Sequence, residues 1–238
     1  MTATVLCAGY GTRLADLTRD TPKPMLPVGG VPILERIVRN LVRAGVTDVA
    51  VNLHFRPDAI RGHFGDGKRW GCRIVYAHEP ALLGTAGGGK NLARLLPPGP
   101  CLIHYGDIVT NQDLTALLAF HTARNALATL LVHKRAKPMS VLTLDAENRV
   151  TRFQERPAAG EWDASAVPWV FSGIAVCEPD VFADVPDDRP SDLARDVFPK
   201  LVGTGCVFAV PLTGERFAID SPERLAQADA AVRVGDWP

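Results

Sequence analysis

The sequence predicts an α/β fold with a largely parallel central sheet. Apolar runs of strand length alternate along the chain with segments in which apolar residues recur at helical spacing. Gly and Pro clusters of the kind that end helices and strands separate several of these segments. With 238 residues, 47% of them hydrophobic and 22% charged, the chain can bury the core of one sizeable α/β domain or two small ones.

The alternation is clearest in the first half of the chain. We expect a helix that begins at Pro32 and ends at Gly45, because aliphatic residues recur there at helical spacing. Further helices are expected at residues 57–64 and 113–123, and a Gly-rich turn that runs into a helix at 84–96. Strands are expected at residues 4–7, 49–53, 72–76, 101–105 and 126–132.

Shorter strands mark the second half, at residues 141–144, 150–154, 169–177, 207–212 and 217–219. A helix is expected at 191–202, and a last one where Ser221 would be the N-cap and Pro222 the first helical residue. We recognise no repeat, low-complexity tract or linker. We therefore expect a single domain over residues 1–238, with a nucleotide-binding half at about 1–125 and an acceptor half at about 126–238.

Charge and cysteine content narrow the function. Lys plus Arg and Asp plus Glu both number 26, so no net positive field would attract nucleic acid or an anionic membrane. The five cysteines include no C-x-x-C pair, which favours buried thiols in a reducing cytosol over disulfides or a zinc site. The N-terminus lacks a signal-peptide pattern, and no apolar run approaches the roughly 20 residues that cross a membrane. We expect a cytoplasmic protein without nucleic-acid or membrane partners.

The stretch LCAGYGTRLADLTRDTPKPMLPV, residues 6–28, organises the chain. Gly9 and Gly11 would let the backbone approach a phosphate and present N–H groups to it. Arg13 and Lys23 add two cations, which suits a triphosphate, and the prolines on both sides of Lys23 stiffen its backbone. A Gly-x-Gly on its own would equally be a tight strand-to-helix turn.

The whole string closely resembles the signature of the sugar-1-phosphate nucleotidyltransferases (nucleoside-diphosphate-sugar pyrophosphorylases), A-G-x-G-T-R-L followed by P-K-P-M-L-P-V. Cys7 stands where these proteins usually have a small residue. The resemblance implies a three-layer, Rossmann-like α/β domain with a mixed, mostly parallel central sheet, of the nucleotide-diphospho-sugar transferase type. It also implies that the loop binds the nucleotide, through Leu6, Ala8, Gly9, Gly11, Thr12 and Arg13.

Two further segments match the family's nucleotide half. Residues 105–107, YGD, resemble its strand followed by G-D, which implies that Asp107 ligates Mg²⁺. A carboxylate after a central parallel strand also lies where open α/β sheets bind ligands. Residues 79–87, EPALLGTAG, resemble E-x-x-x-L-G-T-A-G, which implies that Gly84 and Thr85 contact the nucleoside. Asn52, at the end of the second strand, is either part of the base pocket or a structural residue.

The same region contains a competing motif. Residues 84–91, GTAGGGKN, are one residue short of the phosphate-binding loop G-x-x-x-x-G-K-[ST], because Asn91 stands where a hydroxyl is needed. No strand ends in a suitable Asp that is not already assigned. A P-loop NTPase is therefore the less favoured alternative.

The acceptor half carries two matches. Residues 153–157, FQERP, resemble the family's F-x-E-K-P, whose Glu accepts sugar hydroxyls, and imply a sugar-phosphate role for Glu155. Residues 171–174, FSGI, match its S-G-I segment and imply the same for Ser172 and Gly173. Trp169 beside them would either stack on a sugar face or pack in the core.

Asp220 is the candidate second metal ligand. Many family members read W-x-D-I-G-T-P before the final helix, whereas residues 217–222 read FAIDSP, one residue shorter between the aromatic and the proline. Because a shift of one residue turns a strand's side chain to the other face, Asp220 can serve only if the turn re-aims it. Its alternative role is a carboxylate at the N-terminus of the last helix. We predict the metal role, since Mg²⁺ takes one or two carboxylates beside phosphate oxygens.

Together these matches predict nucleotidyl transfer from an NTP to a sugar 1-phosphate, with release of pyrophosphate. Arg13, Lys23 and Asp107 would be catalytic, Lys23 would also bind the sugar phosphate, and Mg²⁺ would be the cofactor. The sugar phosphate is already a nucleophile, so the protein's work is alignment and charge stabilisation.

The same matches leave alternatives for the nucleobase and the sugar. The segments VNLHF, LGTAG and DVFPKL look most like short mannose- or heptose-1-phosphate guanylyltransferases, which favours GTP. The FSGI segment looks as much like N-acetylmuramate-1-phosphate uridylyltransferase, so a uridylyl- or cytidylyltransferase is the alternative. A non-catalytic regulatory subunit is disfavoured, because all three catalytic residues are present. We expect a monomer or homodimer without the C-terminal β-helix of longer members.

Overall fold

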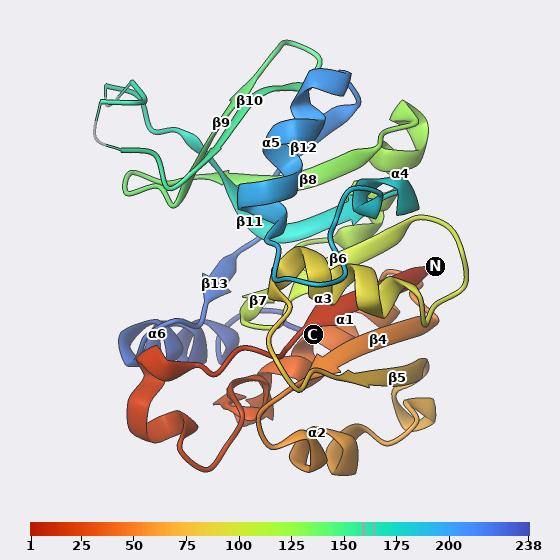
Figure 1. Cartoon of the computed structure of the whole chain (residues 1–238). Helices are drawn as coiled ribbons and strands as arrows, with labels where there is room; N and C mark the ends of the chain where they lie inside the picture. The colour runs from red at the N-terminus through yellow and green to blue at the C-terminus, as the bar shows by residue number, and fades with distance from the viewer. Residues whose placement is uncertain (159, 164) are drawn as a thin grey trace.

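One mixed sheet runs through both halves of the chain (Figure 1). The computed structural model describes residues 1–158, 160–163 and 165–238, and within them this sheet has nine strands, in the order β10-β9-β11-β6-β1-β4-β5 with β8 joining β11 to β12. Strands β5, β4, β1 and β6 are parallel, whereas β11 runs antiparallel to β6, β8 and β9. The strands are β1 (Thr2–Leu6), β4 (Asp48–Leu53), β5 (Arg73–His78), β6 (Cys101–Tyr105), β8 (Ala128–Lys134), β9 (Ser140–Leu144), β10 (Val150–Glu155), β11 (Trp169–Cys177) and β12 (Val207–Pro211).

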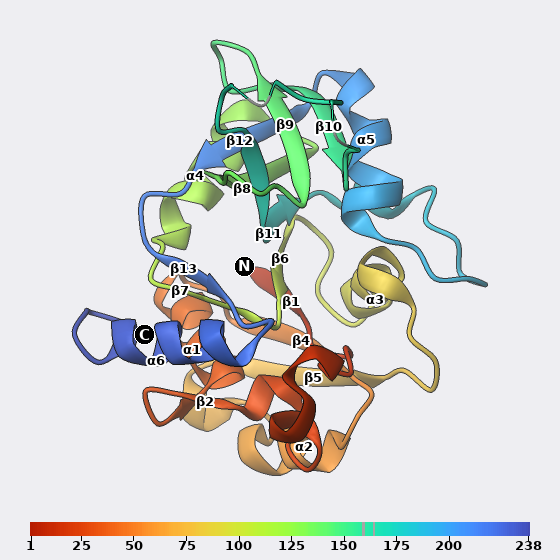
Figure 2. The same cartoon turned by 90° about the vertical axis from the view of Figure 1, so that its left-hand side faces the viewer.

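Helices cover both faces of the sheet, as Figure 2 shows. Beside the parallel strands, α1 (Ile33–Arg43) and α6 (Pro222–Val232) lie on one face and α3 (Gly84–Ala93) on the other. Successive strand residues point to opposite faces, so Leu102 packs in the core under α1 while Ile103 packs in the core that contains Ala86 of α3. The remaining helices are α2 (Pro57–Phe64), α4 (Leu114–Arg124) and α5 (Phe198–Leu201). The predicted three-layer α/β fold with a mixed sheet is confirmed.

Two short antiparallel pairs stand apart from the main sheet. The first is β2 (Pro27–Val28) with β3 (Val31–Pro32), and the second is β7 (Ile108–Thr110) with β13 (Arg216–Ala218). Strand β7 begins directly after Asp107, and Ile219 N–H donates to the Asp107 carbonyl at 2.8 Å. The segment before α6 is thereby held against the end of β6.

Two predicted segments differ from the structure. The helix expected over residues 191–202 is divided into a π-helix (Leu193–Val197), α5 and a 3₁₀ helix (Val202–Thr204). Pro199 has no N–H to donate to a preceding carbonyl, so a regular α-helix cannot run through it. The glycines expected in a turn before a helix at 84–96 lie in α3 itself, which begins at Gly84.

Within the described ranges we find no helix that is both long enough and apolar enough to span a membrane.

Candidate active site

A cavity of about 260 Å³ opens at the carboxyl ends of β1, β4 and β6. Its wall is built from the last residues of these strands, the loops that follow them and the first residues of α3. This edge of an open α/β sheet is where ligands bind in such folds. Most of the predicted catalytic and nucleotide-binding residues line it, namely Leu6, Ala8, Gly9, Lys23, Asn52, Gly84, Thr85 and Asp107.

An ion pair lies at the wall of this cavity. The Lys23 ammonium stands 2.6 Å from Asp107 Oδ2, and their side chains are 11% and 29% exposed. Gly11 has φ of 68°, and a Cβ there would lie 3.1 Å from Lys23 Cβ, so the loop passes closely behind the lysine. Gly106 N–H donates to the Leu6 carbonyl at 2.9 Å. A Cβ at position 106 would lie 2.6 Å from the same carbonyl oxygen and would clash with it. The loops after β1 and β6 therefore hold the lysine and the carboxylate against each other.

Cys7 lies beneath this pair and is not a nucleophile. Burial, and next the negative charge of Asp107, hold the pKa of its thiol far above the usual value, while Lys23 opposes them only in part. The thiol therefore stays protonated, and a thiol is a poor nucleophile. Cys7 N–H donates to Asn52 Oδ1 at 2.6 Å, which ties the start of the loop to β4.

The floor of the cavity is a hydrogen-bonded pair, Asn52 and Glu79, and both side chains are buried. Asn52 Nδ2 donates to Glu79 Oε1 at 2.7 Å, and Leu83 N–H donates to Glu79 Oε2 at 3.2 Å. Gly88 of α3 packs directly on the pair, since a Cβ there would lie 2.8 Å from Glu79 Oε1. We had not singled out Glu79, although it is the first residue of the recognised segment 79–87.

Tyr10 links the loop to the same floor. His54 Nδ1 lies 2.7 Å from the Glu79 carbonyl, which can only accept, so Nδ1 carries the proton. His54 Nε2 then accepts from the Tyr10 hydroxyl at 2.6 Å, and the two rings meet edge to face. These contacts hold the tip of the loop against the end of β4, although Tyr10 is 51% exposed.

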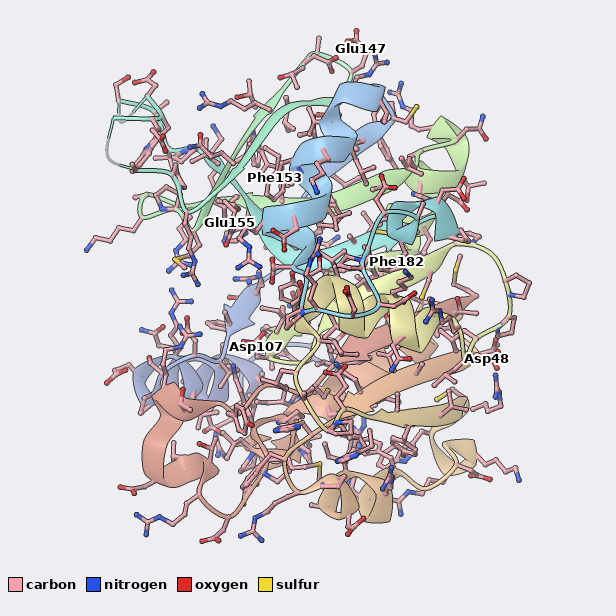
Figure 3. All side chains as sticks on the ribbon, in the orientation of Figure 1. Asp48, Asp107, Glu147, Phe153, Glu155 and Phe182 are labelled. Carbon is pink, nitrogen blue, oxygen red and sulfur yellow. The ribbon has the colours of Figure 1, made fainter. Side chains whose placement is uncertain are left out.

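Glu155, the last residue of β10, lies above Asp107 in Figure 3 and does not line the cavity. Burial, and next the negative charge of Asp192, raise the pKa of Glu155 to about 7. Asp192 lines the cavity, and its Oδ2 accepts from Thr85 Oγ1 at 2.9 Å. Tyr105 packs between the two halves, and burial followed by Asp192, Glu155 and Asp107 raises the pKa of its hydroxyl. Asp192 is not among the predicted site residues. It is the N-cap of the π-helix at Leu193–Val197, and a capping pattern in the sequence indicates such a position but no role at the cavity.

The other sugar-side candidates do not line this cavity either. Ser172 is fully buried, and Gly173 has φ of 82° with the Tyr105 ring 3.3 Å from where its Cβ would be. They lie where the pairing of β11 with β8 shifts register, so this bulge lets Tyr105 approach the strand. Trp169 is half-buried, and Lys134 Nζ lies 5.0 Å from its ring centroid. Trp169 thus packs at the edge of the core.

Arg13 and Asp220 lie at the outer rim. The Arg13 side chain is 72% exposed and pairs with Asp220 Oδ2 at 3.4 Å. Arg13 lies in a 3₁₀ helix (Thr12–Thr18) whose N-cap is Gly11. Asp220 Oδ1 also pairs with Arg224 at 3.4 Å. The N-cap of α6 is Ser221, as predicted, and its Oγ accepts from the Arg224 N–H at 3.3 Å. Asp220 precedes this cap, and its carboxylate pairs with Arg13 and Arg224.

The P-loop alternative is wrong. Residues 84–93 are helical from the first glycine, so they form no loop around a phosphate. The Lys90 ammonium stands 3.1 Å from Asp187 Oδ1 and donates to the Val185 carbonyl. It therefore faces away from the cavity, and the glycines serve close packing of α3.

Comparison with known proteins agrees with this geometry. Residues 2–214 match the model of the family described as nucleotidyl transferase. The chain belongs to the nucleotidyl transferase family. Among curated relatives of the chain, the mannose-1-phosphate guanylyltransferase of Mycobacterium tuberculosis is 34% identical over 205 residues, which cover 85% of this chain and 56% of that protein. The UTP–glucose-1-phosphate uridylyltransferase of Synechocystis is 31% identical over 223 residues, which cover 87% of this chain and 57% of that protein. The chain thus spans somewhat more than half the length of these relatives.

Solved structures show the same fold. A UDP-glucose pyrophosphorylase in complex with UDP-glucose superposes with a TM-score of 0.84 at 16% identity, covering 98% of each chain. HddC from Yersinia pseudotuberculosis in complex with GMP-PN gives 0.78 at 22%, covering 97% of this chain and 99% of that one. At these identities the likeness concerns the fold.

Proposed function

We propose that this nucleotidyl transferase transfers a nucleotidyl group from an NTP, preferably GTP, to a sugar 1-phosphate, giving an NDP-sugar and pyrophosphate. The observation that carries the proposal is the Lys23–Asp107 pair at the wall of a cavity at the carboxyl edge of the sheet. Guanylyl transfer to a mannose- or heptose-like 1-phosphate is supported by the M. tuberculosis relative, whose name states that reaction for mannose.

In this proposal the residues of the chain align the α-phosphate of the NTP with the phosphate of the sugar. The NTP lies along the loop of residues 6–13, with its base toward the Asn52–Glu79 floor and with Gly84 and Thr85 beside the nucleoside. Arg13 holds the β- and γ-phosphates, and Lys23 stabilises charge on the α-phosphoryl group and the incoming sugar phosphate. An oxygen of the sugar phosphate attacks the α-phosphorus, and pyrophosphate leaves in line with it.

On the acceptor side, Glu155 would accept sugar hydroxyls, and its pKa responds to Asp192, which lines the cavity. The bulge at Ser172 and Gly173 would offer backbone groups to the sugar, because the side chain of Ser172 is buried. Trp169 is left with an edge contact at most.

Mg²⁺ fits the residues at the rim. Asp107 and Asp220 are both partly exposed, and the Ile219–Asp107 hydrogen bond holds their backbones together. Two carboxylates suit an ion that takes its other ligands from phosphates and water. Bound there, Mg²⁺ would supply Lewis-acid stabilisation of the phosphates.

The partners in this proposal are small molecules, and the chain works in the cytoplasm as a monomer or homodimer. The thiols support a reducing compartment, since all five cysteines are unpaired and Cys206 is exposed.

Initial rates of pyrophosphate release with each of the four NTPs, crossed with a panel of sugar 1-phosphates in the presence of Mg²⁺, test the proposal. We expect release only when both substrates are present, with the highest kcat/KM for GTP and UTP next. A preference for UTP would favour the uridylyltransferase alternative. Tight nucleotide-sugar binding without turnover of any pair would show a regulatory subunit.

A further inference from the structure

A second hollow, of about 250 Å³, lies beside the proposed sugar site and is strongly cationic. It is lined by residues of β8, β13, α6 and the chain just after β8, among them His133, Arg135, Arg216 and Arg224. It shares no lining residue with the cavity described above. Strand β13 and helix α6, which form its lower wall, stand beneath β11 in Figure 1.

The three arginines are only partly neutralised. Within the described chain Arg224 has an ion pair, at 3.4 Å with Asp220, but that carboxylate is shared with Arg13. For Arg135 and Arg216 the described residues provide no carboxylate within ion-pairing distance. Three positive charges thus converge on one hollow, and among the described residues Asp220 is the one carboxylate that forms an ion pair with any of them.

Arg216 is held in place without being neutralised. Its Nε donates to the Ser172 carbonyl at 2.7 Å, which leaves the terminal nitrogens of the guanidinium on the hollow's side. Burial lowers its pKa to about 10, and Arg135 and Arg224 add to that effect while Asp107 and Asp220 oppose it. Burial followed by the same three arginines lowers the pKa of His133 to about 4, so the histidine is neutral and adds no fourth charge.

Arg224 is stabilised at its position by the ion pair with Asp220 but not by the helix dipole. It lies in the first turn of α6, where the helix dipole disfavours a cation. Bidentate guanidinium groups are the side chains best suited to phosphates and carboxylates. The arrangement therefore suits an anionic group that enters the hollow from solvent.

The hollow is joined to the proposed sugar site through Ser172. The same residue whose carbonyl anchors Arg216 shares a hydrogen bond of 2.9 Å between its Oγ and His133 Nδ1. Its neighbour Gly173 packs on Tyr105, which lines the cavity. Residues 172 and 173 of β11 therefore lie between the arginines of the hollow and Tyr105 at the cavity.

We propose that this hollow is a subsite for a second anionic group on the acceptor, so that the preferred substrate is a sugar 1-phosphate that also carries a phosphate or a carboxylate. The inference rests on the proposed function and names its substrate class. The reacting phosphate would lie at Lys23 and Asp107, and the second anion at Arg135, Arg216 and Arg224.

The test compares acceptors that differ only in the second anion. With GTP and Mg²⁺, or with the NTP that proves best, kcat/KM is measured for glucose 1-phosphate, glucose 1,6-bisphosphate and glucuronic acid 1-phosphate. We expect at least one doubly acidic acceptor to exceed glucose 1-phosphate by about 10-fold or more, the range of a charge-assisted hydrogen bond. A preference for glucose 1,6-bisphosphate would indicate a phosphate subsite, and a preference for glucuronic acid 1-phosphate would indicate a carboxylate subsite.

Arg135→Gln should abolish this preference and leave kcat/KM for glucose 1-phosphate within about 3-fold, because Arg135 makes none of the contacts at the reacting phosphates. Arg224→Gln is the second variant, and Arg152→Gln, an exposed arginine on β10 whose side chain pairs with Gln154, is the matched control. Equal rates for the three acceptors, or equal losses for all of them in Arg135→Gln, would overturn the proposal.

A binding measurement separates this inference from the proposed function. Glucose 1,6-bisphosphate should raise the Tm of the wild-type protein more than glucose 1-phosphate does, and Arg135→Gln should remove the difference even if no acceptor is turned over. If inorganic phosphate alone gives the whole shift in wild type, and acceptor choice does not depend on Arg135, the hollow binds a free anion and the assignment to the acceptor is wrong.

Discussion

Replacing Gly88 by alanine tests whether the floor of the cavity depends on the close approach of α3. The new Cβ would lie 2.8 Å from Glu79 Oε1 and 2.9 Å from Asn52 Nδ2. Both atoms belong to short, buried side chains that are hydrogen-bonded to each other at 2.7 Å and to Cys7 and Leu83. Neither can move away without breaking a hydrogen bond, and contacts below 3 Å do not persist.

The expected magnitude follows from two opposing terms. Alanine in place of glycine favours a helix by about 1 kcal/mol. Overpacking costs about 1–3 kcal/mol, and a buried polar group that loses its partner costs about 1–3 kcal/mol more. The net change is a destabilisation of about 1–5 kcal/mol, and a chain of this size loses about 2–4 °C in Tm per kcal/mol. We also expect the KM for the NTP to rise, because the displaced pair forms the base-side floor.

Gly62→Ala is the matched control. Gly62 lies in α2 with open space where its Cβ would be, so the same substitution should raise Tm by a few degrees, corresponding to up to about 1 kcal/mol. Calorimetric unfolding and steady-state kinetics of both variants give the comparison. If Gly88→Ala is as stable as Gly62→Ala and keeps the wild-type KM, the Asn52–Glu79 pair does not constrain the site as described.

Three further predictions concern charged groups. Lys23→Ala and Arg13→Ala should each lower kcat by about 10²–10³ with little change in Tm, and near-normal rates in both would make the loop structural. Asp220→Asn should weaken the activation of the enzyme by Mg²⁺ in a titration. The free energy of unfolding should change by less than about 1 kcal/mol, because the ion pairs of Asp220 are partly exposed. An unchanged Mg²⁺ titration would mean that Asp107 and water hold the ion without Asp220. Glu155 has a pKa raised from 4.5 to about 7, so its contribution to stability is present below pH 4.5 and is lost as the pH rises through 7. Between pH 4.5 and 7 the free energy of unfolding of the wild-type protein should therefore fall by up to about 3 kcal/mol relative to that of Glu155→Gln. Denaturant titrations at several pH values measure both. If the two proteins show the same dependence of unfolding free energy on pH, the pKa of Glu155 is not raised.

The sequence predicted the layers of the fold because its periodicities reflect burial. Helix α2 (Pro57–Phe64) and strands β6 (Cys101–Tyr105) and β11 (Trp169–Cys177) have the predicted bounds, since each has proline, glycine or a clear apolar run at its ends. Strand β7 (Ile108–Thr110) was not predicted, because three residues carry no readable period, whereas its partner β13 (Arg216–Ala218) was expected one residue further along, at 217–219. The π-helix at Leu193–Val197 escaped as well, since a proline predicts an interruption but not the hydrogen bonding around it.

The site was predictable where the contact is local in sequence. The loop residues and Asp107 follow directly from strand ends, and most of them line the cavity. Asp192 could not be assigned in this way, because it reaches the cavity only through its hydrogen bond to Thr85, 107 residues away. Arg216 likewise depends on a bond to Ser172 across two strands. Such residues are positioned by tertiary pairing, about which a local motif says nothing.

The most direct test of the proposed chemistry is the fate of the three phosphorus atoms of GTP, followed by ³¹P NMR in the presence of Mg²⁺ and an accepted sugar 1-phosphate. Nucleotidyl transfer predicts one NDP-sugar and one pyrophosphate for each GTP consumed, with no reaction when the sugar phosphate is omitted and none in Asp107→Asn. The appearance of GDP with inorganic phosphate, at a rate independent of the sugar phosphate, would contradict it.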